Sequence, residues 1–171
     1  MIRGGLVGEK LRGGECTYAP YRDLCGDLGT ALCKTLLMTE ISMGTLHHVE
    51  LWVPDFARAT EEWGWLLASL GYEAFQSWPK GSSWKQGATY IVLEESEALS
   101  ARSHQRTAPG LNHLAFHAGS PEHVDALSAA GMGHGWKALF ADKYPYAGGS
   151  GHYAAYLENS DGFEVELIAS T

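Results

Sequence analysis

The chain has 171 residues, 45% of them hydrophobic and 19% charged, so it is long enough for one domain with a hydrophobic core. Its net charge of -8 argues against a nucleic-acid partner, because a phosphate backbone is held by clustered Lys and Arg, and the 12 basic residues here are scattered. No apolar run approaches the roughly 20 residues of a membrane-spanning helix. We therefore expect neither nucleic acid nor a membrane among its partners.

The first 43 residues differ from the rest of the chain. They contain all three cysteines, whose spacing fits neither a paired disulfide framework nor a Cys-x-x-Cys metal clip and is more typical of a cytoplasmic protein. They are also rich in glycine and show no sustained hydrophobic period. We predict that residues 1–43 are a poorly ordered extension of a domain at 44–171, with a partner-binding arm as the alternative.

The domain itself is organised around a duplication. Residues 46–53 and 111–118 are both strand-like runs with a His at the third position, namely His48 and His113. Each run is followed by a helix-opening residue and by a helical pattern that ends at a glycine. The sequence therefore predicts two copies of one unit, at about 45–95 and 111–169.

Both copies follow the same order of elements. In the first, a strand at 46–53 precedes a helix that Asp55 caps and Gly71 ends, and then come strands at 72–78, 82–85 and 88–94. Residues 95–110 are polar and irregular and form the linker. In the second, a strand at 112–118 precedes a helix at 121–130 with Ser120 as its N-cap, and then come strands at 136–140, 152–157 and 163–168.

The alternation of residues along the strands predicts what each face carries. Val49, Leu51 and Val53 share one face of the first strand, so His48 points the opposite way. On the last strand, Glu164 and Glu166 lie opposite the apolar Phe163, Val165 and Leu167. A sheet does not bury a carboxylate cheaply without a partner.

If the first and last strands of both units curve into one cup, His48, His113 and Glu166 converge inside it. Two histidines and one carboxylate with open positions form a facial triad, which suits a divalent transition metal such as Fe, Mn, Ni or Zn.

Three motifs resemble one protein family. They are residues 48–53 with Asp55 after them, residues 110–116, and residues 159–167. Together they resemble the vicinal oxygen chelate superfamily, which includes glyoxalase I, fosfomycin-resistance proteins, extradiol dioxygenases and bleomycin-resistance proteins. The resemblance covers 45–169. It implies an α+β fold in which two βαβββ units form a curved, cup-like mixed sheet with helices outside, and metal ligands at His48, His113 and Glu166.

The sequence departs from the four-ligand members of that family in one place. Those members carry a carboxylate on the last strand of unit one, where this chain has Val92. Either the site uses three protein ligands, or Glu94 reaches back from two residues further on. Three ligands are favoured, because two residues along a strand span about 7 Å. The departure weakens the case for glyoxalase I activity itself.

Other side chains are candidates for catalysis. Tyr156 begins a Tyr-x-x-Asn-x-x-Gly pattern that resembles part of the extradiol dioxygenase signature, in which the Tyr hydrogen-bonds a substrate oxygen; a core aromatic is the equal alternative. Glu164, Glu94 and His117 are candidates for moving a proton, with a position at the rim of the cup as the alternative for His117. His152 is at the start of the predicted penultimate strand, where it could face the site.

Three functions follow from this site. The first is a metal-dependent enzyme of lyase, isomerase, transferase or dioxygenase type, acting on a small molecule with vicinal oxygens. The second is a metal-free, bleomycin-resistance-like protein that binds a small molecule or drug, and the third is a domain with a vestigial site. The intact triad favours the first. We also predict a homodimer in which His48 of one chain faces His113 and Glu166 of the other.

Overall fold

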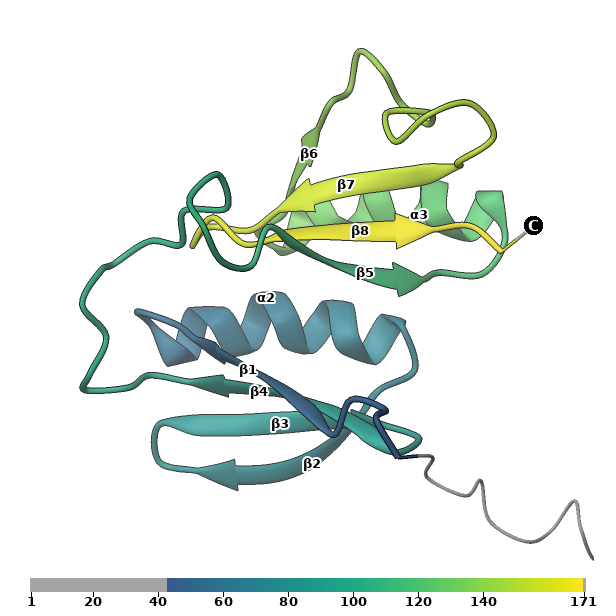
Figure 1. Cartoon of the computed structure of the whole chain (residues 1–171). Coiled ribbons are helices and arrows are strands. Elements are labelled where there is room, and N and C mark those ends of the chain that lie inside the picture. The colour runs from purple at the N-terminus through teal and green to yellow at the C-terminus, as the bar shows by residue number, and fades with distance from the viewer. Residues whose placement is uncertain (1–42, 171) are drawn as a thin grey trace, which may run out of the picture. The chain divides into compact units, whose positions relative to one another are not determined.

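The structure is a computed structural model that describes residues 43–170 (Figure 1). The predicted N-terminal extension therefore lies, but for Met43, outside the described residues. From Gly44 onward the chain forms one compact unit. None of the helices in the described part is long and apolar enough to cross a membrane.

The first unit runs from β1 to β4. It consists of β1 (His48–Trp52), α2 (Phe56–Ser69), β2 (Glu73–Trp78), β3 (Gly81–Gln86) and β4 (Thr89–Glu94). The helix begins where the Asp55 side chain accepts a hydrogen bond from the backbone N–H of Arg58, at 3.0 Å. It ends before Gly71, whose φ of 86° is a left-handed conformation that glycine adopts without strain.

The second unit repeats this order. It consists of β5 (His113–His117), α3 (Pro121–Gly131), the short 3-10 helix η2 (Met132–His134), β6 (Lys137–Leu139), β7 (Ala154–Glu158) and β8 (Glu164–Ile168). Ser120 caps α3 and Pro121 is at its start, as the sequence predicts. Every predicted strand and helix of the domain is present, and β6 is shorter than predicted.

Each unit forms a four-stranded sheet in which the first strand is parallel to the last. The strand orders are β1-β4-β3-β2 and β5-β8-β7-β6. The registers also correspond, since His48 is paired with Tyr90 and His113 with Glu164. The predicted α+β fold of two βαβββ units is confirmed.

The two sheets remain separate within one chain, and α2 lies between them (Figure 1). Trp63 on this helix contacts Trp136 and Phe163 of the second unit, with ring centroids 5.1 and 6.0 Å apart. The same core includes Leu51 and Leu93 of the first sheet. Because α2 buries apolar side chains against both units, the cup stays open and this helix is not outside it. The edge strands β1 and β5 are each paired on one side only.

Each sheet packs one face against a helix and leaves the other uncovered. In the first sheet Leu51, Ile91 and Leu93 enter the core, so the alternate residues of β1 and β4 face away from it. In the second sheet Val165 and Leu167 enter the core. The uncovered faces therefore carry the histidines and glutamates that the sequence analysis singled out.

Candidate functional site

Glu166 is the centre of a hydrogen-bonded cluster on the uncovered face of the second sheet. Its carboxylate Oε1 accepts hydrogen bonds from the Tyr156 hydroxyl and, at 2.6 Å, from His152 Nε2. Its Oε2 lies 3.2 Å from His113 Nε2. The Glu166 side chain is only 8% exposed, so these three neighbours replace most of its contact with water.

The cluster fixes the charge of the Glu166 carboxylate. Burial raises the pKa of Glu166, but the hydrogen bonds from Tyr156 and His152, together with the attraction of His152 and His113, outweigh burial and leave the pKa below its ordinary value. Burial, and then the hydrogen bond to Glu166, raise the pKa of Tyr156. At neutral pH the carboxylate is therefore a pure acceptor, and both Tyr156 and His152 Nε2 donate to it.

Asn112 determines which nitrogen of His113 carries a hydrogen. The Asn112 Nδ2 donates to the backbone oxygen of Arg106 at 2.8 Å, so the amide oxygen is the atom that faces His113 Nδ1, at 2.7 Å. An amide oxygen only accepts, so Nδ1 is the donor. In the neutral ring, Nε2 then carries a lone pair directed at Glu166.

This pair of atoms fits a bound cation. Two neighbouring ligands of a metal with bond lengths near 2.1 Å are about 3 Å apart when they subtend a right angle. The 3.2 Å between His113 Nε2 and Glu166 Oε2 is close to that distance. When the ring takes up a proton instead, the same two atoms form an ion pair, so proton and metal compete for one position.

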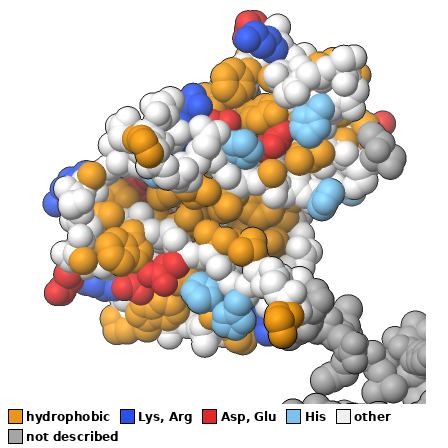
Figure 2. Space-filling view, in the orientation of Figure 1, with side chains coloured by type: hydrophobic (Ala, Val, Ile, Leu, Met, Phe, Trp, Pro, Cys, Tyr) orange, Lys and Arg blue, Asp and Glu red, His pale blue; other side chains and the backbone are white. Residues whose placement is uncertain are grey.

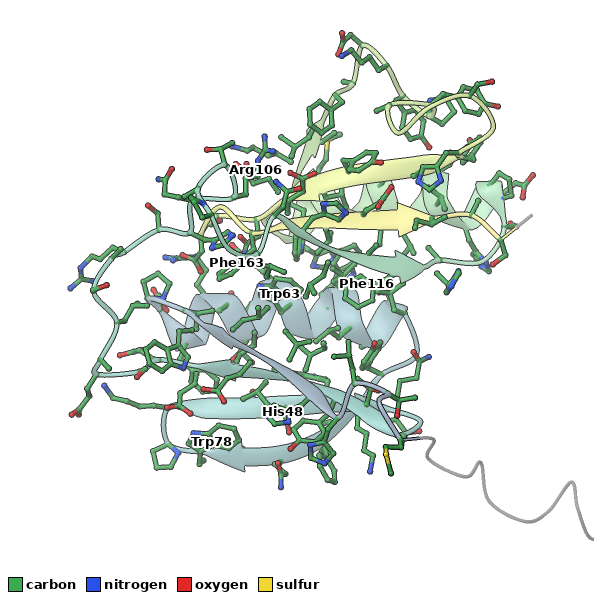
Figure 3. The ribbon with its side chains drawn as sticks, in the orientation of Figure 1. His48, Trp63, Trp78, Arg106, Phe116 and Phe163 are labelled. Atoms are coloured by element: carbon green, nitrogen blue, oxygen red, sulfur yellow. The ribbon has the colours of Figure 1, made fainter. Side chains whose placement is uncertain are left out.

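His48 does not join this cluster within one chain. It lies on β1 in the other sheet, stacked on the Tyr90 ring at a centroid distance of 5.0 Å, with its Nδ1 2.9 Å from His47 Nδ1 (Figure 3). Among residues 43–170, no three His, Cys, Asp or Glu side chains are grouped so that they could hold a metal ion. The structure thus brings together His113, Glu166 and Tyr156 and leaves His48 apart.

The register also bears on a fourth ligand. Val92 lies two residues beyond Tyr90, the partner of His48, as Glu166 lies two residues beyond Glu164, the partner of His113. Val92 therefore occupies the place in the first sheet that Glu166 has in the second. Glu94 pairs with Trp52 at the far end of β1, and in the described chain it makes no hydrogen bond or ion pair with His48.

The two proton-transfer candidates on the second sheet have different surroundings. Glu164 is buried and forms an ion pair with Arg106 Nη1 at 2.7 Å. Arg106 also contacts Glu158, which lies directly opposite Glu164 and is paired with Lys137. His117 is exposed at the end of β5, opposite Ile168, away from Glu166. Neither side chain touches the Glu166 carboxylate.

The linker and the loop at 141–151 also contribute to this face. Sequence periodicity does not predict where side chains of such irregular segments lie. Arg106 belongs to the linker between the units, and its guanidinium lies 5.8 Å from the Phe140 ring, which in turn lies 5.5 Å from the Tyr156 ring. Phe140 has a φ of 54°, a strained conformation for an aromatic residue. Gly148 packs against Tyr156 and His152 so closely that a Cβ there would be 2.6 Å from the Tyr156 hydroxyl. The loop at 141–151 therefore bounds the site.

The surface view shows how the two faces relate. Histidine side chains lie on both halves of the visible face, with hydrophobic surface between them (Figure 2). On the β1 side, Trp52 is 41% and Phe75 47% exposed. A pocket of about 630 Å³ at the end of β1 is lined by Trp52, Leu111 and Phe163 among others.

Two βαβββ units, each with its first strand parallel to its last, form the fold of the vicinal oxygen chelate superfamily. The family description that matches residues 47–156 is the glyoxalase/bleomycin resistance protein/dioxygenase superfamily, and the chain belongs to it.

Individual relatives agree with this assignment. The chain is 42% identical over 125 residues to the Bacillus subtilis protein YqjT, covering 72% of this chain and 98% of that protein. It is 43% identical to a Bacillus halodurans protein provisionally named a glyoxalase, with a TM-score of 0.71 over 75% of this chain and 97% of that one. The Listeria monocytogenes fosfomycin resistance protein FosX, solved with Mn(II) and a dihydroxypropylphosphonic acid, shares the fold at 20% identity and a TM-score of 0.51, over 76% of this chain and 93% of that one.

Proposed function

We propose that the protein is a divalent-metal-dependent enzyme acting on a small molecule with vicinal oxygens. One observation carries the proposal: His113 Nε2 and Glu166 Oε2 converge at 3.2 Å, and the Asn112 side-chain oxygen contacts the other ring nitrogen of His113. The Mn(II) complex of FosX shows that the same fold accommodates a divalent ion elsewhere.

The third ligand of this proposed site is His48 from a second copy of the chain. Within one chain α2 separates the two sheets, and the free edges of β1 and β5 leave backbone groups unpaired. The face of His48 also exposes Trp52 and Phe75, which are costly to leave in water. A homodimer in which the first sheet of one copy covers the second sheet of the other buries both faces and completes the set of His48, His113 and Glu166.

The chain's own groups would divide the work at this site. A bound divalent ion would supply Lewis acidity toward the two substrate oxygens. The raised pKa keeps Tyr156 neutral, so its single O–H remains a donor; Glu166 accepts it in this structure, and it would turn to a substrate oxygen when negative charge develops there. His152 donates to Oε1 of Glu166, the oxygen that does not face His113, and so holds the carboxylate in place.

Glu164 and His117 remain the proposed proton-transfer groups, and they differ in readiness. Glu164 forms an ion pair with Arg106, which fixes the Glu164 carboxylate but blocks part of a substrate's access to it. His117 is exposed, and it lies on the same face of β5 as His113. The loop at 141–151 contacts Tyr156 through Gly148 and so bounds one side of the reacting groups.

A metal-free, drug-binding cup is the second candidate function. It is favoured by the aromatic side chains of the first sheet. The ring centroids of Phe75 and Tyr90 are 5.5 Å apart, and Tyr90 stacks on His48. Such a cup needs aromatic surface but no converging ligands. The two functions therefore differ in whether the protein takes up metal.

Metal content separates the two. Protein purified without chelator is expected to take up about one Zn²⁺ or Mn²⁺ per chain, and His113→Ala to abolish this while the circular dichroism spectrum stays the same. His117→Ala is the matched control, because it removes an imidazole from the same face of the same strand without touching Glu166. Equal metal content in wild type and His113→Ala would refute the metal site.

A further inference from the structure

The residue before each of the two histidines contacts the Nδ1 atom of that histidine. In the second unit, Asn112 Oδ1 is 2.7 Å from His113 Nδ1, and in the first unit His47 Nδ1 is 2.9 Å from His48 Nδ1. The two pairs occupy equivalent places in the duplicated unit, as the matching registers of β1 with β4 and of β5 with β8 show. In both units, therefore, Nδ1 is engaged and Nε2 is left for another partner.

The choice of nitrogen has a chemical consequence. A neutral imidazole has one bare nitrogen, and a metal binds only that nitrogen. If His113 carried its hydrogen on Nε2, that hydrogen would satisfy Glu166 and no lone pair would be directed at the carboxylate. The acceptor at Nδ1 therefore separates a histidine that can bind metal from one that only hydrogen-bonds. His152, whose Nε2 donates to Glu166, is in the second state.

The Asn112 side chain is itself held by a hydrogen bond to the linker. Its amide nitrogen donates to the backbone oxygen of Arg106, and the Arg106 side chain is tied to Glu164 and Glu158 on β8 and β7. The amide can therefore not turn over to present its nitrogen to His113 without losing this bond. The linker and the second sheet together hold the acceptor oxygen in place.

We propose that Asn112 is a positioning residue that holds His113 with Nε2 bare for the metal, and that His47 does the same for His48 by presenting its own Nδ1 as the acceptor. This inference rests on the proposed function, since it assigns no ion of its own. Loss of the partner that orients a metal-binding histidine typically weakens metal affinity 10- to 100-fold. The Asn112 side chain would have that effect without contacting the ion.

Two variants of Asn112 separate orientation from packing. Asn112→Asp keeps an oxygen acceptor for His113 Nδ1 but loses the donor to Arg106, whereas Asn112→Leu has a similar size and no acceptor. In full-length protein titrated with Zn²⁺ against a competing chelator, Asn112→Leu is expected to bind 10- to 100-fold more weakly than wild type, and Asn112→Asp within a few fold of it. Equal losses in both variants, or none in Asn112→Leu, would overturn the proposal.

A spectroscopic measurement reads the orientation without metal. In the two-dimensional ¹H–¹⁵N spectrum of the ring nitrogens at pH 8, the His113 signals are assigned by their absence from His113→Ala. His113 Nδ1 is expected to carry a hydrogen in wild type and in Asn112→Asp, and to lose this preference in Asn112→Leu. A bare Nδ1 in wild type refutes the positioning role, while wild type that shows the expected spectrum but binds no Zn²⁺ refutes the proposed metal site alone.

The first unit provides an independent arm. His47→Asn copies the pair found in the second unit and is expected to keep Zn²⁺ affinity, whereas His47→Leu is expected to weaken it at least 10-fold. If both substitutions leave the Zn²⁺ affinity unchanged, His47 has no orienting role. The proposal then stands for Asn112 alone, provided that Asn112→Leu weakens Zn²⁺ binding as expected.

Discussion

Asn159 Nδ2 donates a hydrogen bond to Glu62 Oε2 at 3.0 Å and thereby joins the β7–β8 turn of the second unit to α2 of the first. Both side chains are buried, Asn159 being 3% and Glu62 4% exposed. The Asn159 oxygen meanwhile accepts from the backbone N–H groups of Asp161 and Phe163, at 3.1 and 2.9 Å. One amide therefore shapes the turn that leads into β8 and also holds α2 between the sheets.

Replacing Asn159 should destabilise the whole domain. Asn159→Leu leaves the buried Glu62 carboxylate without this donor and two turn N–H groups without their acceptor, which we expect to cost about 3 kcal/mol. Urea denaturation followed by circular dichroism measures the loss. Ser160→Ala, at the neighbouring exposed position, is the control and should change stability by less than about 0.5 kcal/mol. Similar midpoints for the two variants would show that this junction does not hold the units together.

The duplication made much of this fold predictable. Strand alternation alone places Glu166 opposite Val165 and Leu167, and the apolar set of β1 similarly places His48 on an uncovered face. The sequence pattern puts His113 and Glu166 together only if the first and last strands of a unit are neighbours, and the structure shows that they are parallel neighbours. Their separation of 3.2 Å does not follow from the pairing alone, because the register places Glu164 opposite His113 and Glu166 two residues further along β8.

What the sequence could not predict depends on contacts between distant segments. The apolar spacing of α2 indicates a buried helix, but it does not tell that Trp63 packs on Trp136 and Phe163 of the other unit. For the same reason, the open cup and the isolation of His48 could not be seen. Arg106 reaches the site from an irregular linker, where no period restricts the direction of a side chain.

Removing the Tyr156 hydroxyl should raise the pKa of Glu166. Burial raises this pKa and hydrogen bonds lower it, so Tyr156→Phe leaves burial less opposed. In wild type the pKa lies below the ordinary 4.5, so the ionised carboxylate stabilises the fold above that pH, and this contribution is lost as the pH falls through the lower, folded-state value. In Tyr156→Phe the loss should begin at higher pH.

A titration of the Glu166 carboxyl ¹³C signal in metal-free protein measures this change. Tyr153→Phe is the control, because the Tyr153 hydroxyl donates to Asp125 and not to Glu166. A Glu166 titration that is the same in Tyr156→Phe and in wild type would mean that the phenol does not stabilise the carboxylate.

The N-terminal segment should be dispensable for the stability of the domain. The family match begins at residue 47, and 125 residues of this chain account for 98% of the Bacillus subtilis relative. We therefore expect that deleting residues 1–43 changes the melting temperature little. A fall of more than about 10 °C, which corresponds to several kcal/mol for a domain of this size, would show that the segment is a docked part of the fold.

Complementation between two inactive chains tests whether the metal site is shared. The structure keeps His48 in one sheet and Glu166 in the other, with α2 between the sheets, so each intact site is expected to need two copies. His48→Ala and Glu166→Ala chains should each bind little Zn²⁺ as homodimers. After co-refolding, a heterodimer has one site that carries both substitutions and one that carries neither.

The mixed sample should therefore recover close to a quarter of the wild-type Zn²⁺ content, because random pairing makes half of the dimers mixed and each has one intact site of two. Mixing His48→Ala with His113→Ala should give the same recovery, since His113 lies on the same sheet as Glu166. Mixing His113→Ala with Glu166→Ala is the control and should recover nothing, because both substitutions affect the same sheet. No recovery in either of the first two mixtures, or a monomer by light scattering at micromolar concentration, would show that no site is shared between copies.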